Sequence, residues 1–271
     1  MHERDANERE VFYRDVIRDL IKNQNASVLV CGGGALDKKV LESLGFLDVT
    51  ISNLDTRMTG NEYAPFKWKY ENAESLSFHD ESFDYVIIHA AIHHVSSPHK
   101  VLTEMYRVAR KGTLSIESRD SIIMRFLEKY GFSPVYEHAA VYHNDCQYGG
   151  VNNTDIPNYI YRWTEREIEK TIQTFAPFFW HKFHYRYGTA FPSTPELENK
   201  AKIKTLFLKF MRPFFWLFTK GFPKQQNLFA FYIEKSTDPN SLFPWLTFDD
   251  AEQKIKFNKK WGDEKYKTPK R

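Results

Sequence analysis

Cysteine is scarce in this sequence. Its 271 residues include only Cys31 and Cys146, which excludes a disulfide framework and makes a reducing compartment the expectation. No cysteine and histidine grouping has the spacing of a structural zinc site, and no metal is expected. The net charge is only +3, so the composition gives no general reason to expect a nucleic-acid partner.

Long apolar runs are missing as well. Residues 1–15 have no apolar core of the kind found in a signal peptide. No uncharged run reaches the roughly 18 residues that span a bilayer, because the longest candidate, residues 205–222, contains Lys209, Arg212 and Lys220. We therefore expect a cytoplasmic protein. Hydrophobic residues make up 42% and charged residues 27% of the chain, which is globular composition.

Short apolar runs alternate with helical patterns along most of the chain. The expected strands are residues 28–30, 49–54, 68–70, 84–89, 113–117, 179–187 and 228–234, and the expected helices include residues 8–23, 38–44 and 99–109. This alternation predicts a doubly wound α/β domain with a parallel sheet covered on both faces. We expect an N-terminal helix in residues 1–24, the α/β domain in residues 25–235 and an extension with a further helix in residues 236–271.

A glycine turn follows the first expected strand. Gly32, Gly33 and Gly34 precede a helix, and glycine lets a ligand approach the backbone closely while the helix amides favour a carboxylate or phosphate. Asp55 ends the second strand, 21 positions after Gly34, where a carboxylate can accept both hydroxyls of a ribose. The alternatives are a plain structural turn and a helix cap. A nicotinamide cofactor and S-adenosylmethionine both remain possible on these residues alone.

Four later segments distinguish between these cofactors. They are residues 71–78 (ENAESLSF), 82–89 (SFDYVIIH), 93–95 (HHV) and 101–112 (VLTEMYRVARKG). Their order and spacing resemble those of class I S-adenosylmethionine-dependent methyltransferases, specifically the small-molecule group called type 11. The resemblance covers about residues 25–120 well and residues 164–187 more loosely. It implies a Rossmann-like sheet of seven strands, the last one antiparallel, with a helical insert before that strand.

The same resemblance assigns the cofactor site. The three glycines would face the methionine part of S-adenosylmethionine, and Asp55 would hold the ribose. A position that meets the adenine amino group corresponds to Asn72, and a carbonyl near the methionine ammonium corresponds to His89. The complete set of expected cofactor-binding residues is Gly32, Gly33, Gly34, Asp55, Thr56, Asn72, Ala73 and His89.

The chain departs from the family pattern at three places. Val30 stands where the family usually has an acidic residue, Leu36 stands where it has another glycine, and residues 110–112 replace a Pro-Gly-Gly surface turn. A non-catalytic binding or scaffold protein with this fold therefore stays open as an alternative. A nicotinamide oxidoreductase would need a complete glycine fingerprint, and here Asp37 occupies the place of its third glycine.

Histidines gather after the fourth strand, where open α/β sheets bind ligands. A histidine that titrates near neutral pH can take a proton from a hydroxyl, so His93, His94 and His143 are candidate bases. Asp145 could orient His143. The alternatives are that these side chains only pack, or that catalysis rests on positioning. No acidic residue lies beside them at ligand spacing, which argues against a metal.

Residues 121–163 are expected to form the substrate side. This segment mixes aromatic faces with hydrogen-bonding groups, which suits a sugar or a phenol. Candidate substrate-binding residues are Tyr142, Asp145, Tyr148 and Arg162. The alternative is a lid that packs its own aromatic residues. The expected reaction is methyl transfer to an oxygen of a small molecule, such as a sugar or secondary metabolite, because signatures of nucleic-acid methyltransferases are absent.

A basic aromatic insert occupies residues 199–224. From Lys200 to Lys224 it has seven lysine and arginine residues and no acidic residue, and its apolar residues recur at helical spacing. Such a helix can lie in a membrane interface. It could equally pack on the sheet or form a homodimer contact. Pro213 is expected to kink it or to begin a second helix.

Overall fold

The computed structural model describes residues 3–190, 202–236, 241–249 and 251–267. Its centre is a sheet of seven strands in the order β3-β2-β1-β4-β5-β7-β6. The strands are β1 (Val28–Cys31), β2 (Val49–Asn53), β3 (Lys67–Tyr70), β4 (Phe83–His89), β5 (Ala109–Ser118), β6 (Lys182–Gly188) and β7 (Leu228–Glu234). Only β7 runs antiparallel to its two neighbours. The predicted seven-stranded α/β sheet with an antiparallel last strand is confirmed.

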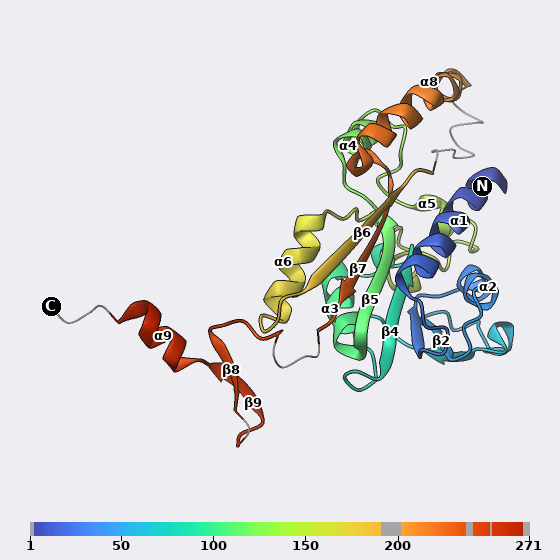
Figure 1. The fold of residues 1–271 in the computed structure, drawn as a ribbon. Coiled ribbons are helices and arrows are strands. Elements are labelled where there is room, and N and C mark those ends of the chain that lie inside the picture. Colours follow the sequence, from blue (N-terminus) through green and yellow to red (C-terminus); the bar gives the residue numbers. More distant parts are fainter. Residues whose placement is uncertain (1–2, 191–201, 237–240, 250, 268–271) are drawn as a thin grey trace.

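Helices cover both faces of the sheet (Figure 1). Helices α1 (Glu3–Leu20) and α2 (Ala35–Ser43) lie on one face, and α3 (Pro98–Val108) and α6 (Glu165–Phe175) lie on the other. Side chains of β1 alternate between the two resulting cores: Leu29 and Cys31 join one, and Val28 and Val30 join the other. Full burial of an aliphatic side chain contributes about 1.5–3 kcal/mol, so burial on both faces accounts for the near-continuous apolar runs of these strands.

Further helices gather at the edge to which the carboxyl ends of the parallel strands point. They are α4 (Ile122–Lys129), α5 (His138–Tyr142) and α8 (Lys202–Gly221). Helix α8 precedes β7, whose first residue Leu228 pairs with Ser118 at the end of β5. The predicted insert is thus helical where the structure describes it, with Pro213 inside a single helix. Its residues 199–201 lie outside the described ranges.

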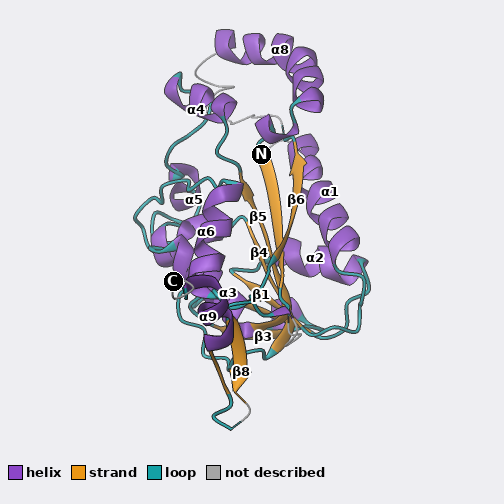
Figure 2. Ribbon diagram, turned by 60° about the vertical axis from the view of Figure 1, so that its left-hand side comes forward, coloured by secondary structure: helices purple, strands orange, loops and turns teal. Residues whose placement is uncertain are grey.

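The C-terminal residues project from the body of the molecule (Figures 1 and 2). They form the antiparallel hairpin of β8 (Leu246–Asp249) and β9 (Lys254–Phe257), followed by α9 (Lys259–Tyr266). The sequence patterns predicted a helix here but gave no sign of the hairpin. Within the described ranges, no helix combines the length and the apolar character that crossing a membrane requires.

One predicted turn is wrong. Arg110, Lys111 and Gly112 belong to β5, which begins immediately after α3. Gly112 pairs with Tyr85 of β4 and with Glu234 of β7. A Cβ at Gly112 would lie 2.6 Å from the carbonyl oxygen of Ile233, so this glycine serves close packing between strands rather than a surface turn.

Candidate functional site

The glycine turn lies where the strand order reverses, between β1 and β4. Gly32 has a φ of +62°, and a Cβ at this residue would lie 2.6 Å from Cβ of Ala91. The turn after β1 therefore touches the segment that follows β4. Such a switch point, outside the carboxyl ends of the strands, is where open α/β sheets bind ligands.

The next two glycines have different surroundings. A Cβ at Gly33 would lie 2.8 Å from both Val30 and Ile51, whereas a Cβ at Gly34 would meet no atom within 4 Å. The amide of Gly34 donates to Oδ2 of Asp37 at 2.8 Å. The position of Gly33 thus has no room for a side chain, whereas the space beside Gly34 is open. This geometry fits the close approach of a nucleoside cofactor to the backbone.

Asp55, the expected ribose ligand, is engaged by a neighbouring arginine. Its Oδ1 accepts from Nε of Arg57 at 2.8 Å, and its Oδ2 accepts from the guanidinium at 2.7 Å. These hydrogen bonds hold the pKa of the Asp55 carboxyl below its usual value. Arg57 also lies 4.3 Å from the ring centre of Tyr148 and 3.2 Å from Oδ1 of Asn144. Thr56 is exposed in the turn between them.

The other expected cofactor residues lie along the same edge. Asn72 follows β3, and its Oδ1 accepts from the amide of Glu74 at 2.9 Å. Ala73 is partly buried against the core on the α3 side. His89 ends β4 and stacks on Tyr13 of α1 with 4.2 Å between ring centres, and burial lowers its pKa. The edge therefore carries each expected group at the end of a strand.

A carboxylate that the sequence motifs did not indicate lies beside the glycine turn. Oδ1 of Asp37 accepts from the hydroxyl of Tyr13 at 2.7 Å, while its other oxygen binds the amide of Gly34. Both side chains are buried. Tyr13 lies within the apolar face of an ordinary amphipathic helix, so nothing in the local pattern distinguishes it from a core residue.

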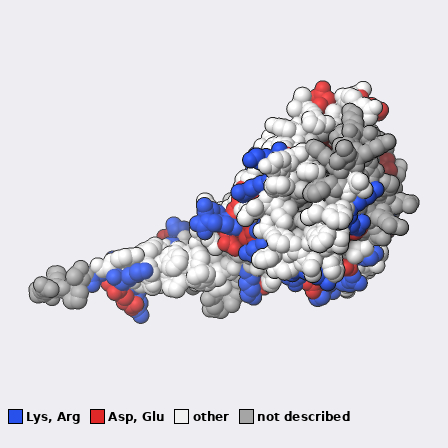
Figure 3. All heavy atoms as spheres, turned by 90° about the horizontal axis from the view of Figure 1, so that it is seen from above, with Lys and Arg blue, Asp and Glu red and all other residues white. Residues whose placement is uncertain are grey.

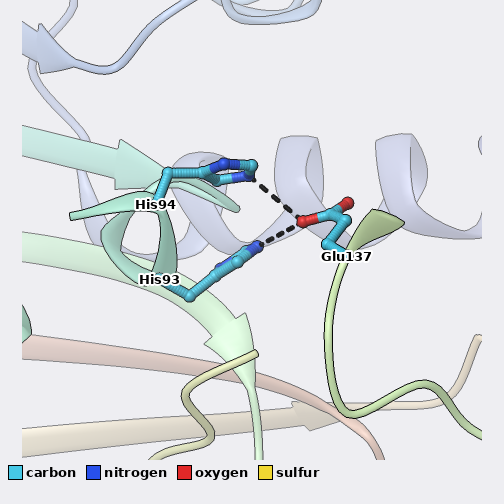
Figure 4. Close-up of side chains that lie close together, drawn as sticks. All are labelled: His93, His94 and Glu137. Carbon is cyan, nitrogen blue, oxygen red and sulfur yellow. Dashed lines mark hydrogen bonds and ion pairs between the residues drawn. The ribbon is translucent and has the colours of Figure 1, made fainter. Parts of the chain in front are cut away.

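Two of the expected histidines belong to a cluster with two glutamates. His93 and His94 lie on η2 (Ile92–His94), directly after β4. Nε2 of His93 and Nε2 of His94 each lie 3.2 Å from Oε2 of Glu137 (Figure 4). Nδ1 of His93 lies 2.7 Å from Oε2 of Glu117, the penultimate residue of β5. The fold thus supplies the acidic partner that the sequence spacing does not show, and the argument from spacing against a metal fails here.

The cluster has an unusual charge balance. Burial lowers the pKa of His93, but Glu117 and Glu137 more than offset this effect and raise that pKa to about 10. Burial raises the pKa of Glu137, but the two histidines lower it well below its usual value. With a proton on each ring nitrogen, His93 donates to both carboxylates and is no base. His94, whose side chain is 26% exposed, is the more accessible ring.

The expected substrate residues are not brought together as one pocket. Tyr142, His143 and Asp145 are exposed around the end of α5, and among the residues that the structure describes no hydrogen bond joins His143 to Asp145. Tyr148 lies under Arg57. Arg162 is ion-paired with Glu128 and donates to the carbonyl oxygen of Pro134 at 3.0 Å. Arg162 therefore stabilises the fold of residues 121–163 through contacts within that segment.

Two asparagines fasten this segment to the sheet edge. Nδ2 of Asn152 donates to Oγ of Ser96 at 2.9 Å, just beyond η2. Nδ2 of Asn153 donates to the carbonyl oxygen of Leu54 at 3.2 Å, at the end of β2. The segment thus spans from the expected ribose site to the histidine turn. Sequence reasoning missed both residues, although two consecutive asparagines are typical of a turn.

Comparisons with known proteins agree with this architecture. Residues 29–116 match the model of a family described as methyltransferase domain, whereas no curated protein matches the chain significantly. One chain of the complex between the Haloferax volcanii Trm112 methyltransferase activator and a putative methyltransferase is 13% identical, with a TM-score of 0.54, over 87% of this chain and 94% of that chain. A possible histamine N-methyltransferase from Thermotoga maritima is 16% identical, with a TM-score of 0.49, over 86% and 92%.

The family match covers β1 through most of β5, the segment that contains the glycine turn and the histidine pair. The strand order and the antiparallel β7 extend the same architecture to the rest of the sheet. Residues 29–116 therefore resemble a methyltransferase domain, and the whole sheet has the strand order and antiparallel last strand of the class I methyltransferase fold.

Proposed function

We propose that the protein is an S-adenosylmethionine-dependent methyltransferase that acts on an oxygen of a small polar acceptor, such as a sugar or secondary metabolite. The observation that carries the proposal is the cluster of His93, His94 and Glu137 at the sheet edge, next to the glycine turn. When bound, S-adenosylmethionine supplies a sulfonium-activated methyl group. The protein has to bind the two reactants, exclude water and accept the proton that the acceptor hydroxyl releases.

The expected cofactor contacts are consistent with the geometry described above. The open side of Gly34 would receive the methionine part, and Asn72, with the amide of Ala73, would meet the adenine. Asp55 would bind the ribose once Arg57 releases one or both of its oxygens. The carbonyl of His89 would lie near the methionine ammonium, where the absent acid at Val30 leaves fewer partners.

Proton uptake falls to the cluster. His93 is fixed between Glu117 and Glu137, so its part is to orient the second carboxylate. The hydroxyl proton of the acceptor would pass to the imidazole of His94, and the carboxylate of Glu137 would stabilise the resulting positive charge. These two side chains face solvent with exposures of 26% and 35%. General-base assistance of this kind contributes about 10²–10⁴-fold, and positioning of the reactants supplies a further share.

Cofactor binding is the first test. We expect isothermal titration calorimetry to give micromolar binding of S-adenosylmethionine and S-adenosylhomocysteine and none of NADH. Asp55→Ala should weaken binding by about tenfold or more, the loss of a charged hydrogen-bond pair. Asp48→Ala, which removes an exposed carboxylate outside the site, is the matched control.

Each contrary result has a definite meaning. Binding of NADH instead of S-adenosylmethionine would overturn the proposed donor. Absence of binding by a folded protein would favour the non-catalytic scaffold alternative. Once binding is established, an acceptor screen should begin with sugars and phenols, and transfer only to nitrogen or carbon acceptors would contradict the oxygen assignment.

A second candidate property is contact with an anionic membrane surface. Leu206, Phe210 and Leu217 of α8 are each at least 67% exposed, and α4, at the same end of the molecule, also has an exposed apolar residue, Ile122. Seen from above, the described surface at this end of the molecule is mostly uncharged, with both basic and acidic residues at its margins (Figure 3). A cavity of about 780 Å³ lies between α1 and α8. Apolar side chains with basic and no acidic residues on the helix suit an anionic lipid interface.

Vesicle co-sedimentation tests this contact. We expect binding to vesicles that contain phosphatidylserine and little binding to pure phosphatidylcholine. Phe210→Glu combined with Leu217→Glu should abolish it, whereas Leu47→Glu, at an equally exposed site before β2, should not. Failure to sediment with either vesicle, or a concentration-dependent dimer that the double variant dissociates, would overturn the membrane assignment.

A further inference from the structure

We propose that His93, His94 and Glu137 form a binding site for a divalent transition-metal ion of the Zn²⁺ type, with an open coordination position for the acceptor oxygen. Three potential ligand atoms, one from each side chain, all lie within 4.8 Å of one another. Two histidines and one carboxylate are a recurrent ligand set of catalytic zinc and of non-haem iron sites. The ion-binding part stands on this geometry alone, whereas the role of the open position rests on the proposed function.

Two of the three distances between the potential ligand atoms match what a bound ion requires. Two ligands about 2.1 Å from a tetrahedral metal ion lie about 3.4 Å apart. The structure places Nε2 of each ring 3.2 Å from the same oxygen of Glu137, and the rings converge on that oxygen (Figure 4). A small outward shift of the Glu137 carboxylate would place an ion between the three atoms.

A supporting shell is already in place. Glu117 has a fully buried side chain and contacts Nδ1 of His93 at 2.7 Å. Its other oxygen accepts from the amides of Ala91 and Ile92 at 2.9 and 3.0 Å. A carboxylate on the distal nitrogen is what fixes the orientation and tautomer of a metal-binding histidine. Nε2 of His93 is thereby directed into the cluster.

The charge of the cluster and its exposure to solvent also favour a bound cation. Two carboxylates face two imidazole rings, so a divalent cation would balance their combined negative charge. Asn158 is fully buried, with Nδ2 3.5 Å from Oε2 of Glu137. Its Oδ1 has no hydrogen-bond partner in the described part of the chain. The partial exposure of His94 and Glu137 leaves a side open for the entry of an ion and an acceptor.

An ion at this position changes how the cluster acts. The ion would displace the proton from Nε2 of His93, and both rings would be ligands rather than proton acceptors. The metal would bind and polarise the acceptor hydroxyl as a Lewis acid, so that the hydroxyl proton passes to solvent water at the exposed side of the site while the oxygen takes the methyl group. Loss of His94 would then reduce turnover by loss of the ion. Metal binding and cofactor binding are separate measurements, so failure of one leaves the other standing.

The test uses full-length protein stripped with a chelator. We expect calorimetric titration with Zn²⁺ to show one equivalent per chain, and Co²⁺ to give the visible absorption of a low-coordinate site. Glu137→Ala and His94→Ala should each weaken binding by at least about 100-fold through loss of a ligand, and Glu117→Gln should weaken it by about 10–100-fold. The matched control is His79→Ala, which removes an exposed histidine away from the site.

Circular dichroism and S-adenosylhomocysteine binding confirm that each variant is folded. Absence of stoichiometric binding by the folded wild type would overturn the proposal. It would also be overturned if Glu137→Ala and His94→Ala both retained full affinity, or if His79→Ala lowered affinity equally. Retained S-adenosylhomocysteine binding in a protein that takes no metal would reject the metal site while leaving the proposed donor intact.

Discussion

Adjacent glycines at the end of β1 serve different purposes. Gly33 has Val30 and Ile51 against its Cα, while Gly34 faces open space. At Gly33 the absent side chain permits packing of the turn onto the sheet. At Gly34 it leaves open space, which we propose that the cofactor uses. A single sequence motif would then combine a folding requirement with a binding requirement, and substitution can separate them.

Alanine at these two positions should give opposite outcomes. Gly33→Ala forces a methyl group against two core side chains and should lower the free energy of unfolding by about 1–3 kcal/mol. Gly34→Ala should change stability by less than about 0.5 kcal/mol but weaken S-adenosylhomocysteine binding. Urea denaturation and calorimetry measure the two effects. A destabilised Gly34→Ala variant with unchanged affinity would contradict the separation.

Arg57 gives a second prediction at this scale. Its guanidinium competes with a ribose for the oxygens of Asp55. We expect Arg57→Ala to bind S-adenosylhomocysteine several-fold more tightly in calorimetry, since no ion pair must be broken first. The control is Arg125→Ala, which removes an exposed ion pair with Asp120 on α4. Weaker binding by Arg57→Ala would instead place this side chain among the cofactor contacts.

At the scale of elements, one ion pair joins the start of α6 to the sheet. Arg119, just beyond β5, pairs with Glu165 at 2.7 Å, and the hydroxyl of Tyr187 in β6 donates to the same carboxylate at 2.6 Å. Burial raises the pKa of Glu165, but Arg119 and Tyr187 bring it below its usual value. Because this pKa is lower in the folded chain than in the unfolded chain, where it is about 4.3, the charged carboxylate stabilises the fold fully at pH values above about 4.3.

Glu165→Gln should therefore destabilise the protein in a pH-dependent way. At pH 7 the free energy of unfolding should fall by about 1.5–3 kcal/mol, which is the contribution of hydrogen bonds to a charged group. As the pH falls below about 4, the wild-type carboxylate becomes protonated, so the difference in free energy of unfolding between the wild type and the variant should narrow. Urea denaturation between pH 3 and pH 7 measures it. A difference that stays constant over this range would contradict the assigned charge.

Elements also show how far sequence patterns reach. Thr164 caps α6, with its hydroxyl accepting from the amide of Glu167. The Thr-x-x-Glu spacing of residues 164–167 is typical of such a cap, because a cap depends on residues three positions apart. The position of His93 and His94 after the fourth strand could also be predicted from the sequence. The contribution of Glu137 could not, because this residue reaches His93 from a segment without periodicity, 44 positions along the chain. Arg162 looked like a substrate ligand because its partners, Glu128 and Pro134, are distant in sequence.

At the scale of the whole molecule, the C-terminal hairpin and α9 stand apart from the sheet. Their aromatic residues pack mainly on one another, with Trp245 stacked on Phe243 at 4.5 Å, and Phe243 contacts Trp180 ahead of β6. The seven-stranded sheet is complete at Glu234. The strand order, the two cores and the candidate site therefore owe little to residues 236–271.

Removal of residues 236–271 should leave the α/β domain of residues 25–235 folded. We expect the melting temperature to change by no more than about 4 °C, which corresponds to about 1 kcal/mol for a domain of this size. Affinity for S-adenosylhomocysteine should be unchanged. Thermal denaturation followed by circular dichroism, with calorimetry, provides the measurement. A truncated chain that does not fold would show that the extension contributes to the core.

Arg57 connects two parts of the molecule that are distant in sequence. Its guanidinium holds Asp55 and also contacts Asn144 and Tyr148 of the substrate-side segment. A ribose that takes Asp55 would release this arginine and with it a fastening of that segment. The two reactants would then bind in a compulsory order, with the methyl donor first and the acceptor second, and product inhibition patterns would reveal that order.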